Sequence, residues 1–120
     1  MLSLEQCKAL EAARLPQSPM LNSVKDVSED GKRLVYYRCP NYNEIIADIQ
    51  RLYYCLTITV NHYFDDHGYS CNAILSTRNC TAELPLKRSL DDLGYAIYMF
   101  LREAYDGHRF DLRKREADNE

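Results

Sequence analysis

Apolar and polar residues alternate from Leu56 to Asn61 in the stretch Leu56-Thr57-Ile58-Thr59-Val60-Asn61-His62-Tyr63-Phe64. The chain continues with Asp65-Asp66-His67-Gly68 and then with Tyr69-Ser70-Cys71-Asn72-Ala73-Ile74-Leu75-Ser76. The alternation predicts a strand with one buried face, and the glycine-containing turn predicts a hairpin whose second segment is the return strand. We expect Phe64 to lie opposite Tyr69. This register is supported because it places apolar residues opposite each other, in the pairs Val60 with Ala73 and Ile58 with Leu75.

Three helices are predicted around this hairpin, over residues 4–14, 42–52 and 89–107. Each begins at a side chain that can cap the first turn and carries an apolar stripe at helical spacing. The three capping residues are Ser3, Asn41 and Ser89.

Three further segments are assigned from their residue types. Residues 33–38, Arg-Leu-Val-Tyr-Tyr-Arg, are rich in β-branched and aromatic side chains and predict another strand. Residues 17–32 contain serines, asparagine, Asp30 and Gly31 and predict a polar, mobile loop. Residues 78–86 fit either a loop or a short edge strand, and both alternatives stay open.

The order of these elements predicts an α+β fold, with three helices packed on one face of a small, mainly antiparallel sheet of three to four strands. We expect residues 1–107 to form a single domain. Residues 108–120 carry four charges of each sign and predict a charged, frayed tail.

The composition is that of a globular protein and restricts its partners. Of the 120 residues, 46% are hydrophobic and 28% are charged, which excludes a disordered acidic chain. The net charge of -3 is too small to predict direct nucleic-acid binding. No apolar run is long enough for a membrane span and no leader pattern opens the chain, so we expect a cytoplasmic protein with no membrane contact.

Candidate metal ligands and nucleophiles lie on the hairpin. The register places His62 opposite Cys71, and with His67 these residues are candidates for a zinc site. We expect a core cysteine and an exposed histidine instead, with no metal and no cofactor, because structural zinc sites show two paired ligand motifs. A Cys-His nucleophile is also disfavoured, since no oxyanion donor and no orienting residue can be named. The five cysteines show no C-x-x-C spacing, and we expect them all to be reduced.

The face of the hairpin opposite the predicted core carries uncharged polar residues. Tyrosine is abundant, with ten residues, and tyrosine among small hydrogen-bonding residues is typical of protein contact surfaces. An ordinary solvated face, with the tyrosines in half-buried strand positions, is the alternative. We expect partner-binding residues on this face, joined by the tyrosines of strand 33–38 if that strand lies alongside. The candidates are Asn61, Tyr63, Asn72, Ile74, Tyr36 and Tyr37.

The order of motifs also resembles a known group of proteins. The chain opens with residues 2–17, Leu-Ser-Leu-Glu-Gln-Cys-Lys-Ala-Leu-Glu-Ala-Ala-Arg-Leu-Pro-Gln, and continues with Tyr36-Tyr37-Arg38-Cys39-Pro40 before an Asn-x-x-Glu helix. A Gly68-Tyr69 hairpin and a helix rich in leucine and isoleucine follow. This pattern is similar to that of small uncharacterised proteins of phage and prophage genomes, over residues 2 to 107. The resemblance implies a phage origin and supplies no catalytic residue.

Two functional hypotheses follow. The first is a non-enzymatic, phage-derived protein that binds and blocks a host protein or protein complex in the host cytoplasm, as an anti-defence protein of the anti-CRISPR kind. The alternative is a sponge for a nucleotide-type small molecule, with tyrosines stacked on a base and Arg33, Arg38 or Arg78 on a phosphate. A homodimer stays open under both hypotheses.

Overall fold

A computed structural model describes residues 1–13, 22–78, 80–106 and 113–114. Three helices and seven strands lie within these residues. The helices are α1 (Leu4–Ala12), α2 (Tyr42–Leu52) and α3 (Leu90–Asp106). The strands are β1 (Ser23–Val27), β2 (Leu34–Arg38), β3 (Tyr53–Tyr54), β4 (Thr57–Asp65), β5 (Gly68–Ser76), β6 (Thr81–Glu83) and β7 (Arg113–Lys114).

The main sheet is antiparallel, with strand order β4-β5-β6. Phe64 pairs with Tyr69 and Val60 with Ala73, so the predicted hairpin register is confirmed. The turn requires a glycine, since Gly68 has a φ of 99°. Residues 78–86, which fit either a loop or a short edge strand, contain β6, a short edge strand that pairs with β5.

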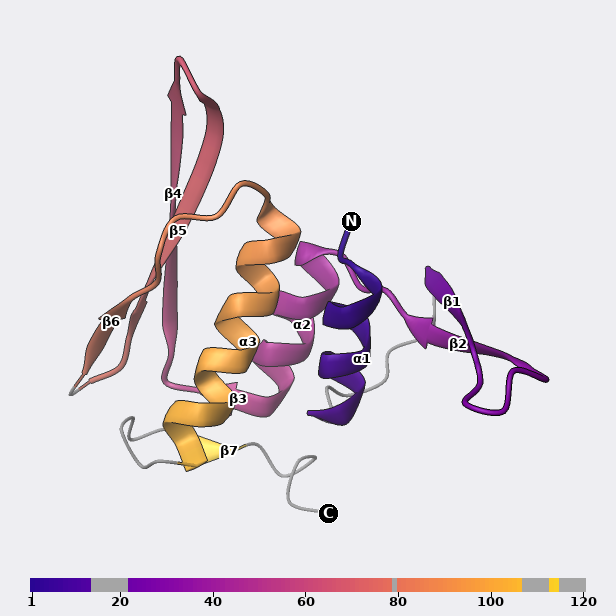
Figure 1. Cartoon of the computed structure of the whole chain (residues 1–120). Helices are drawn as coiled ribbons and strands as arrows, with labels where there is room; N and C mark the ends of the chain where they lie inside the picture. Colours follow the sequence, from indigo (N-terminus) through magenta and orange to yellow (C-terminus); the bar gives the residue numbers. More distant parts are fainter. Residues whose placement is uncertain (14–21, 79, 107–112, 115–120) are drawn as a thin grey trace.

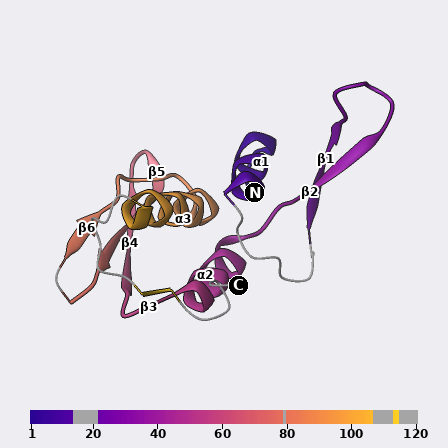
Figure 2. The same cartoon turned by 90° about the horizontal axis from the view of Figure 1, so that it is seen from below.

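The helices lie on one side of this sheet, which confirms the predicted α+β class. In both Figures 1 and 2 the order across the molecule is main sheet, α3, α2, α1, and then the hairpin of β1 and β2. α3 packs against β5, while α2 and α1 pack against α3. Gly94 allows the close approach of α3 to α2, because a Cβ there would lie 3.2 Å from the ring of Tyr42. The three predicted caps form, with Ser3, Asn41 and Ser89 each accepting an N–H of the first helical turn.

The core lies between β5 and the helices. Leu75, Ala73 and Cys71 of β5 are fully buried beneath α3. On β4, Ile58 and Val60 are only half-buried. The buried face predicted for the hairpin is therefore carried by β5, because β5 is the central strand and β4 is an edge strand.

Two sequence expectations were wrong in part. Within the predicted loop 17–32, Ser23–Val27 forms strand β1, which pairs with β2 although two of its five residues are charged. Within the predicted frayed tail, Arg113–Lys114 pairs with Tyr53–Tyr54. In both cases the strand forms because it pairs with a segment elsewhere in the chain, and the local composition does not reveal this pairing. The predicted helix ends at residues 14 and 107 lie outside the described residues.

Candidate functional site

The side of the main sheet that faces away from the helices is the candidate site, and we call it the outer face. β4, the central strand β5 and the short strand β6 all contribute side chains to it. No helix covers this face in the described part of the chain (Figure 1). Its ten residues are Thr57, Thr59, Asn61, Tyr63, Ser70, Asn72, Ile74, Ser76, Thr81 and Glu83.

A chain of amide and carboxylate groups crosses the outer face. Nδ2 of Asn61 donates to Oδ1 of Asn72 at 3.2 Å, and Nδ2 of Asn72 donates to Oε1 of Glu83 at 2.8 Å. Asn72 is only 4% exposed, so it links its neighbours instead of meeting solvent. The only carboxylate of the outer face is thus already held by a neighbouring side chain.

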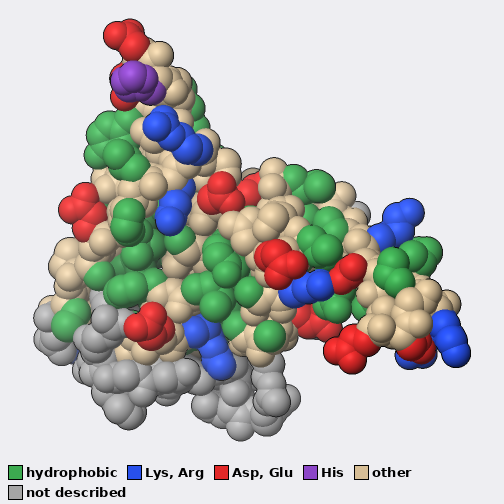
Figure 3. All heavy atoms as spheres, in the orientation of Figure 1, with side chains coloured by type: hydrophobic (Ala, Val, Ile, Leu, Met, Phe, Trp, Pro, Cys, Tyr) green, Lys and Arg blue, Asp and Glu red, His purple; other side chains and the backbone are tan. Residues whose placement is uncertain are grey.

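Tyr63 is the large exposed side chain of the outer face. It lies directly opposite Ser70, near the end of the hairpin, and is 44% exposed. The hairpin projects beyond the layer of helices (Figure 1). Phe64, on the opposite side of the same strand, is 79% exposed for this reason. Figure 3 shows hydrophobic side chains on this projection, below its acidic and histidine-bearing tip.

The other two candidate tyrosines lie elsewhere. Tyr36 and Tyr37 belong to β2, whose partner is β1, so they do not extend the outer face. Tyr37 faces α1, where Nζ of Lys8 lies 5.7 Å from the centre of its ring. Tyr36 is 53% exposed on the opposite side of β2.

Two of the three candidate metal ligands, Cys71 and His62, contact other groups. Cys71 is fully buried, and its thiol donates to the backbone carbonyl of Ser89 at 3.6 Å. Nδ1 of His62 lies 2.8 Å from the hydroxyl of Tyr69, and His67 lies in the exposed turn. Across the ranges that the structure describes, no group of three or more histidine, cysteine or acidic side chains could hold a metal ion.

All five cysteines are free, as predicted. Burial, together with a hydrogen bond to Cys39, raises the pKa of Cys7 to about 12. A thiol with this pKa stays protonated at neutral pH and is a poor nucleophile. Cys7 therefore behaves as a core residue.

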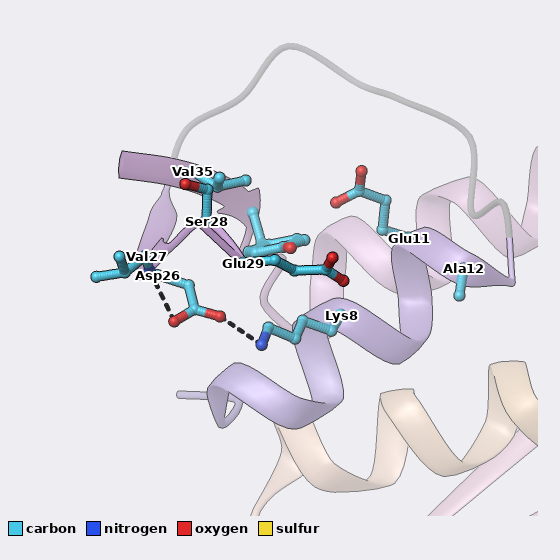
Figure 4. A pocket seen from close by; sticks show the side chains of 9 residues that line it. Lys8, Glu11, Ala12, Asp26, Val27, Ser28, Glu29 and Val35 are labelled. Atoms are coloured by element: carbon cyan, nitrogen blue, oxygen red, sulfur yellow. Dashed lines mark hydrogen bonds and ion pairs between the residues drawn. The ribbon is translucent and has the colours of Figure 1, made fainter. Parts of the chain in front are cut away.

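A hollow of about 550 Å³ lies between α1 and the β1–β2 hairpin (Figure 4). Three carboxylates line it, from Glu11, Asp26 and Glu29, against the single ammonium of Lys8. Lys8 is bound to Asp26, and this contact raises the pKa of the lysine and lowers that of the aspartate. The lining is thus acidic, which opposes the binding of a phosphate.

Sequence reasoning missed a buried cluster of charges that attaches β2 to α2. Nη1 of Arg38 donates to Oδ2 of Asp48 at 3.0 Å, and Nη2 lies 4.0 Å from Oε2 of Glu44. Asp48 is fully buried and also pairs with Arg51. Arg38 was a candidate phosphate ligand, but the structure commits its guanidinium to this cluster. An aspartate on the apolar stripe of α2 was the available signal, because such a residue needs a cationic partner.

A narrow groove separates α2 from the first half of β4. It has a volume of about 160 Å³, and its lining exposes polar and apolar atoms in about equal measure. Its lining residues are Tyr42, Ile46, Ile49, Gln50, Tyr53, Leu56 and Ile58.

Comparisons of the chain with protein families, with curated proteins and with solved structures found no match. Among the described residues, no helix has both the length and the apolar character that crossing a membrane requires.

Proposed function

We propose that this protein is a non-enzymatic binding protein of phage origin that attaches to a host protein and blocks it. The target class is a component of a bacterial immune system of the CRISPR type. The contact surface is the outer face. One observation carries the proposal: ten side chains from three strands form a face that no helix of the described residues covers, and its single charge is bound by Asn72.

The composition of the outer face supports contact with a protein. A solvated sheet face usually carries lysine and glutamate, whereas this one carries threonine, serine, asparagine and tyrosine. Small hydroxyl and amide groups adapt their hydrogen bonds to a partner at a low entropic cost. Tyrosine adds a large, rigid contact area. Because the outer face carries few charges, binding removes few charged groups from water.

The contact residues have different roles within this face. Tyr63 is the anchor because it combines the largest area with exposure at the projecting end. Asn61 and Ile74 are half-buried: Asn61 follows Tyr63 on this face of β4, whereas Ile74 lies opposite Thr59, further along the hairpin. Asn72 acts as a positioning residue, since its amide holds Asn61 and Glu83 in place.

A capture experiment tests the proposal. The purified protein is immobilised and exposed to lysate of a bacterium that carries an active CRISPR system, and bound proteins are identified by mass spectrometry. Tyr63→Ala should reduce capture of a stoichiometric host protein by tenfold or more, in line with the loss of an interface anchor. Tyr36→Ala is the matched control, because it removes an exposed tyrosine from a different sheet.

The same variants are then produced in the defended host during phage infection. The wild-type protein and Tyr36→Ala should restore phage growth, whereas Tyr63→Ala should not. Equal capture by all three proteins, or no effect on phage growth across a panel of defended hosts, would contradict the proposal.

A further inference from the structure

One edge of β4 has no strand beside it in the described part of the chain. Along β5, the backbones of Cys71 and Ala73 bond away from β4: Cys71 exchanges hydrogen bonds with Lys87 at 2.8 and 2.7 Å, and Ala73 accepts from Leu84 at 2.9 Å. In an antiparallel sheet successive residues direct their N–H and C=O groups to opposite sides. The odd-numbered residues of β4 therefore bond to β5. The even-numbered residues, Ile58, Val60, His62 and Phe64, direct theirs out of the open edge.

This edge lacks the usual protection against pairing. Edge strands in natural proteins are commonly short or interrupted by proline, lysine or a bulge. β4 is nine residues long, pairs without a bulge from Thr57 to Asp65, and contains neither proline nor lysine. Such an edge accepts another strand.

The open edge also carries an exposed apolar side chain, the knob, and a groove. Phe64 is 79% exposed near one end of β4. The groove beside α2 opens near the other end, where Ile58 and Leu56 line it. Knob and groove lie on the same side of the strand, because residues 58 and 64 differ by an even number.

We propose that the occupant of this edge is a second copy of the chain. The two β4 strands pair antiparallel about a two-fold axis at Asn61, so that Ile58 of one copy lies opposite Phe64 of the other. The outward groups of the four even-numbered residues in each copy then form eight hydrogen bonds between the chains. Each Phe64 reaches the mouth of the groove in the other copy, which makes the surface self-complementary.

The size of this contact places it among the small specific interfaces. A nine-residue edge is about 30 Å long and about 10 Å thick. Together with the exposed part of Phe64, the two copies bury about 1,000 Å² in total, since a phenylalanine contributes about 150–250 Å² when fully buried. Specific interfaces begin near this area, so we expect a dissociation constant in the micromolar range.

Pairing at the edge leaves the outer face open. The two sheets become one antiparallel sheet of six strands, and Thr59 of one copy lies beside Tyr63 of the other on its outer face. The proposed host-binding surface is thereby doubled and made continuous. The dimer does not depend on that function, because it uses the edge and the opposite side of β4.

Sedimentation equilibrium of the purified full chain tests the dimer. The wild type should have twice its chain mass of 14.0 kDa at about 100 µM. Phe64→Ser removes the knob and should weaken the dimer by tenfold or more. Val60→Pro removes an outward N–H without removing a bond to β5, and it should also give a monomer. Tyr36→Ser is the control and should leave the dimer unchanged.

Cysteine cross-linking tests the register. In a Cys55→Ser background, Asn61→Cys places two thiols across the two-fold axis, where Cα atoms of a non-hydrogen-bonded pair lie about 4.5 Å apart. Oxidised glutathione should then yield a covalent dimer. Thr57→Cys is the matched control, because its two copies would lie about 27 Å apart and should not cross-link.

A wild type that stays monomeric at about 100 µM would overturn the proposal, as would a dimer that survives both Phe64→Ser and Val60→Pro. Equal cross-linking of Asn61→Cys and Thr57→Cys would do the same. A monomer that still captures its host protein through Tyr63 would refute the dimer alone and leave the proposed function standing.

Discussion

Leu75 and Ile74 are neighbours on the central strand and point to opposite faces of the main sheet. Leu75 is 0% exposed beneath the helices, whereas Ile74 is half-buried on the outer face. Substituting each by alanine removes a similar aliphatic volume from each face. The pair therefore measures how differently the two faces are covered.

The two losses should differ clearly. Leu75→Ala removes three buried carbons, each contributing about 0.8 kcal/mol, and leaves a cavity that β5 and α3 cannot close. We expect it to lower the free energy of unfolding by about 3–4 kcal/mol. Ile74 is already partly exposed to solvent, so Ile74→Ala removes fewer buried contacts. We expect it to lower the free energy of unfolding by about 1 kcal/mol.

Urea unfolding followed by circular dichroism measures both values. With a slope of about 1.5 kcal/mol per molar urea, the midpoint should fall by about 2 M for Leu75→Ala and by less than about 1 M for Ile74→Ala. Similar losses in the two variants would refute the reasoning, because they would mean that the outer face is covered as well as the inner one.

Three further predictions concern charges and thiols. Asp48→Ala leaves the guanidinium of Arg38 buried without its carboxylate and should destabilise the fold by about 3–5 kcal/mol in the same urea assay. The contact with Lys8 lowers the pKa of Asp26 below 3.8. The stabilisation that this ion pair gives to the folded state is therefore present above about pH 4, and it is lost as the pH falls through the folded-state pKa of Asp26. The melting temperatures of wild type and Asp26→Asn should therefore differ at neutral pH and converge in acid. Cys55 is the only exposed cysteine, so Cys55→Ser should remove the fastest phase of thiol labelling by Ellman's reagent.

The β4–β5 hairpin was predictable because its information is local. Alternation fixes which side chains share a face, and the length of the turn fixes the pairing, so Phe64 and Tyr69 could be matched without the rest of the chain. The helix starts were predictable for the same reason, since a capping side chain acts within one turn. Strand order is not local. The sequence could not show that β4 lies at an edge, so the predicted buried face did not distinguish the half-buried Ile58 from the fully buried Leu75.

The candidate site was predicted only in part. The alternation of residues identified the outer face with Asn61 and Tyr63. It also predicted Asn72 as a contact residue, although the amide of Asn72 is hydrogen-bonded to Asn61 on one side and to Glu83 on the other. The exposure of Phe64 could not be predicted from the sequence, because it depends on how far the hairpin extends beyond the helices. Strand β1 was not predicted, because three of the five residues of Ser23–Val27 are polar and the strand forms by pairing with β2.

Hydrogen exchange of the β4 amides, resolved by NMR, tests most directly how this strand is used. Bonds to β5 should protect the odd-numbered amides at every protein concentration. The amides of Ile58, Val60, His62 and Phe64 should be protected at about 100 µM and should lose this protection on dilution to about 1 µM, as a micromolar dimer dissociates. Rapid exchange of these four amides at every concentration, while the odd-numbered amides stay protected, would contradict the occupied edge. Rapid exchange of both sets would contradict the sheet itself.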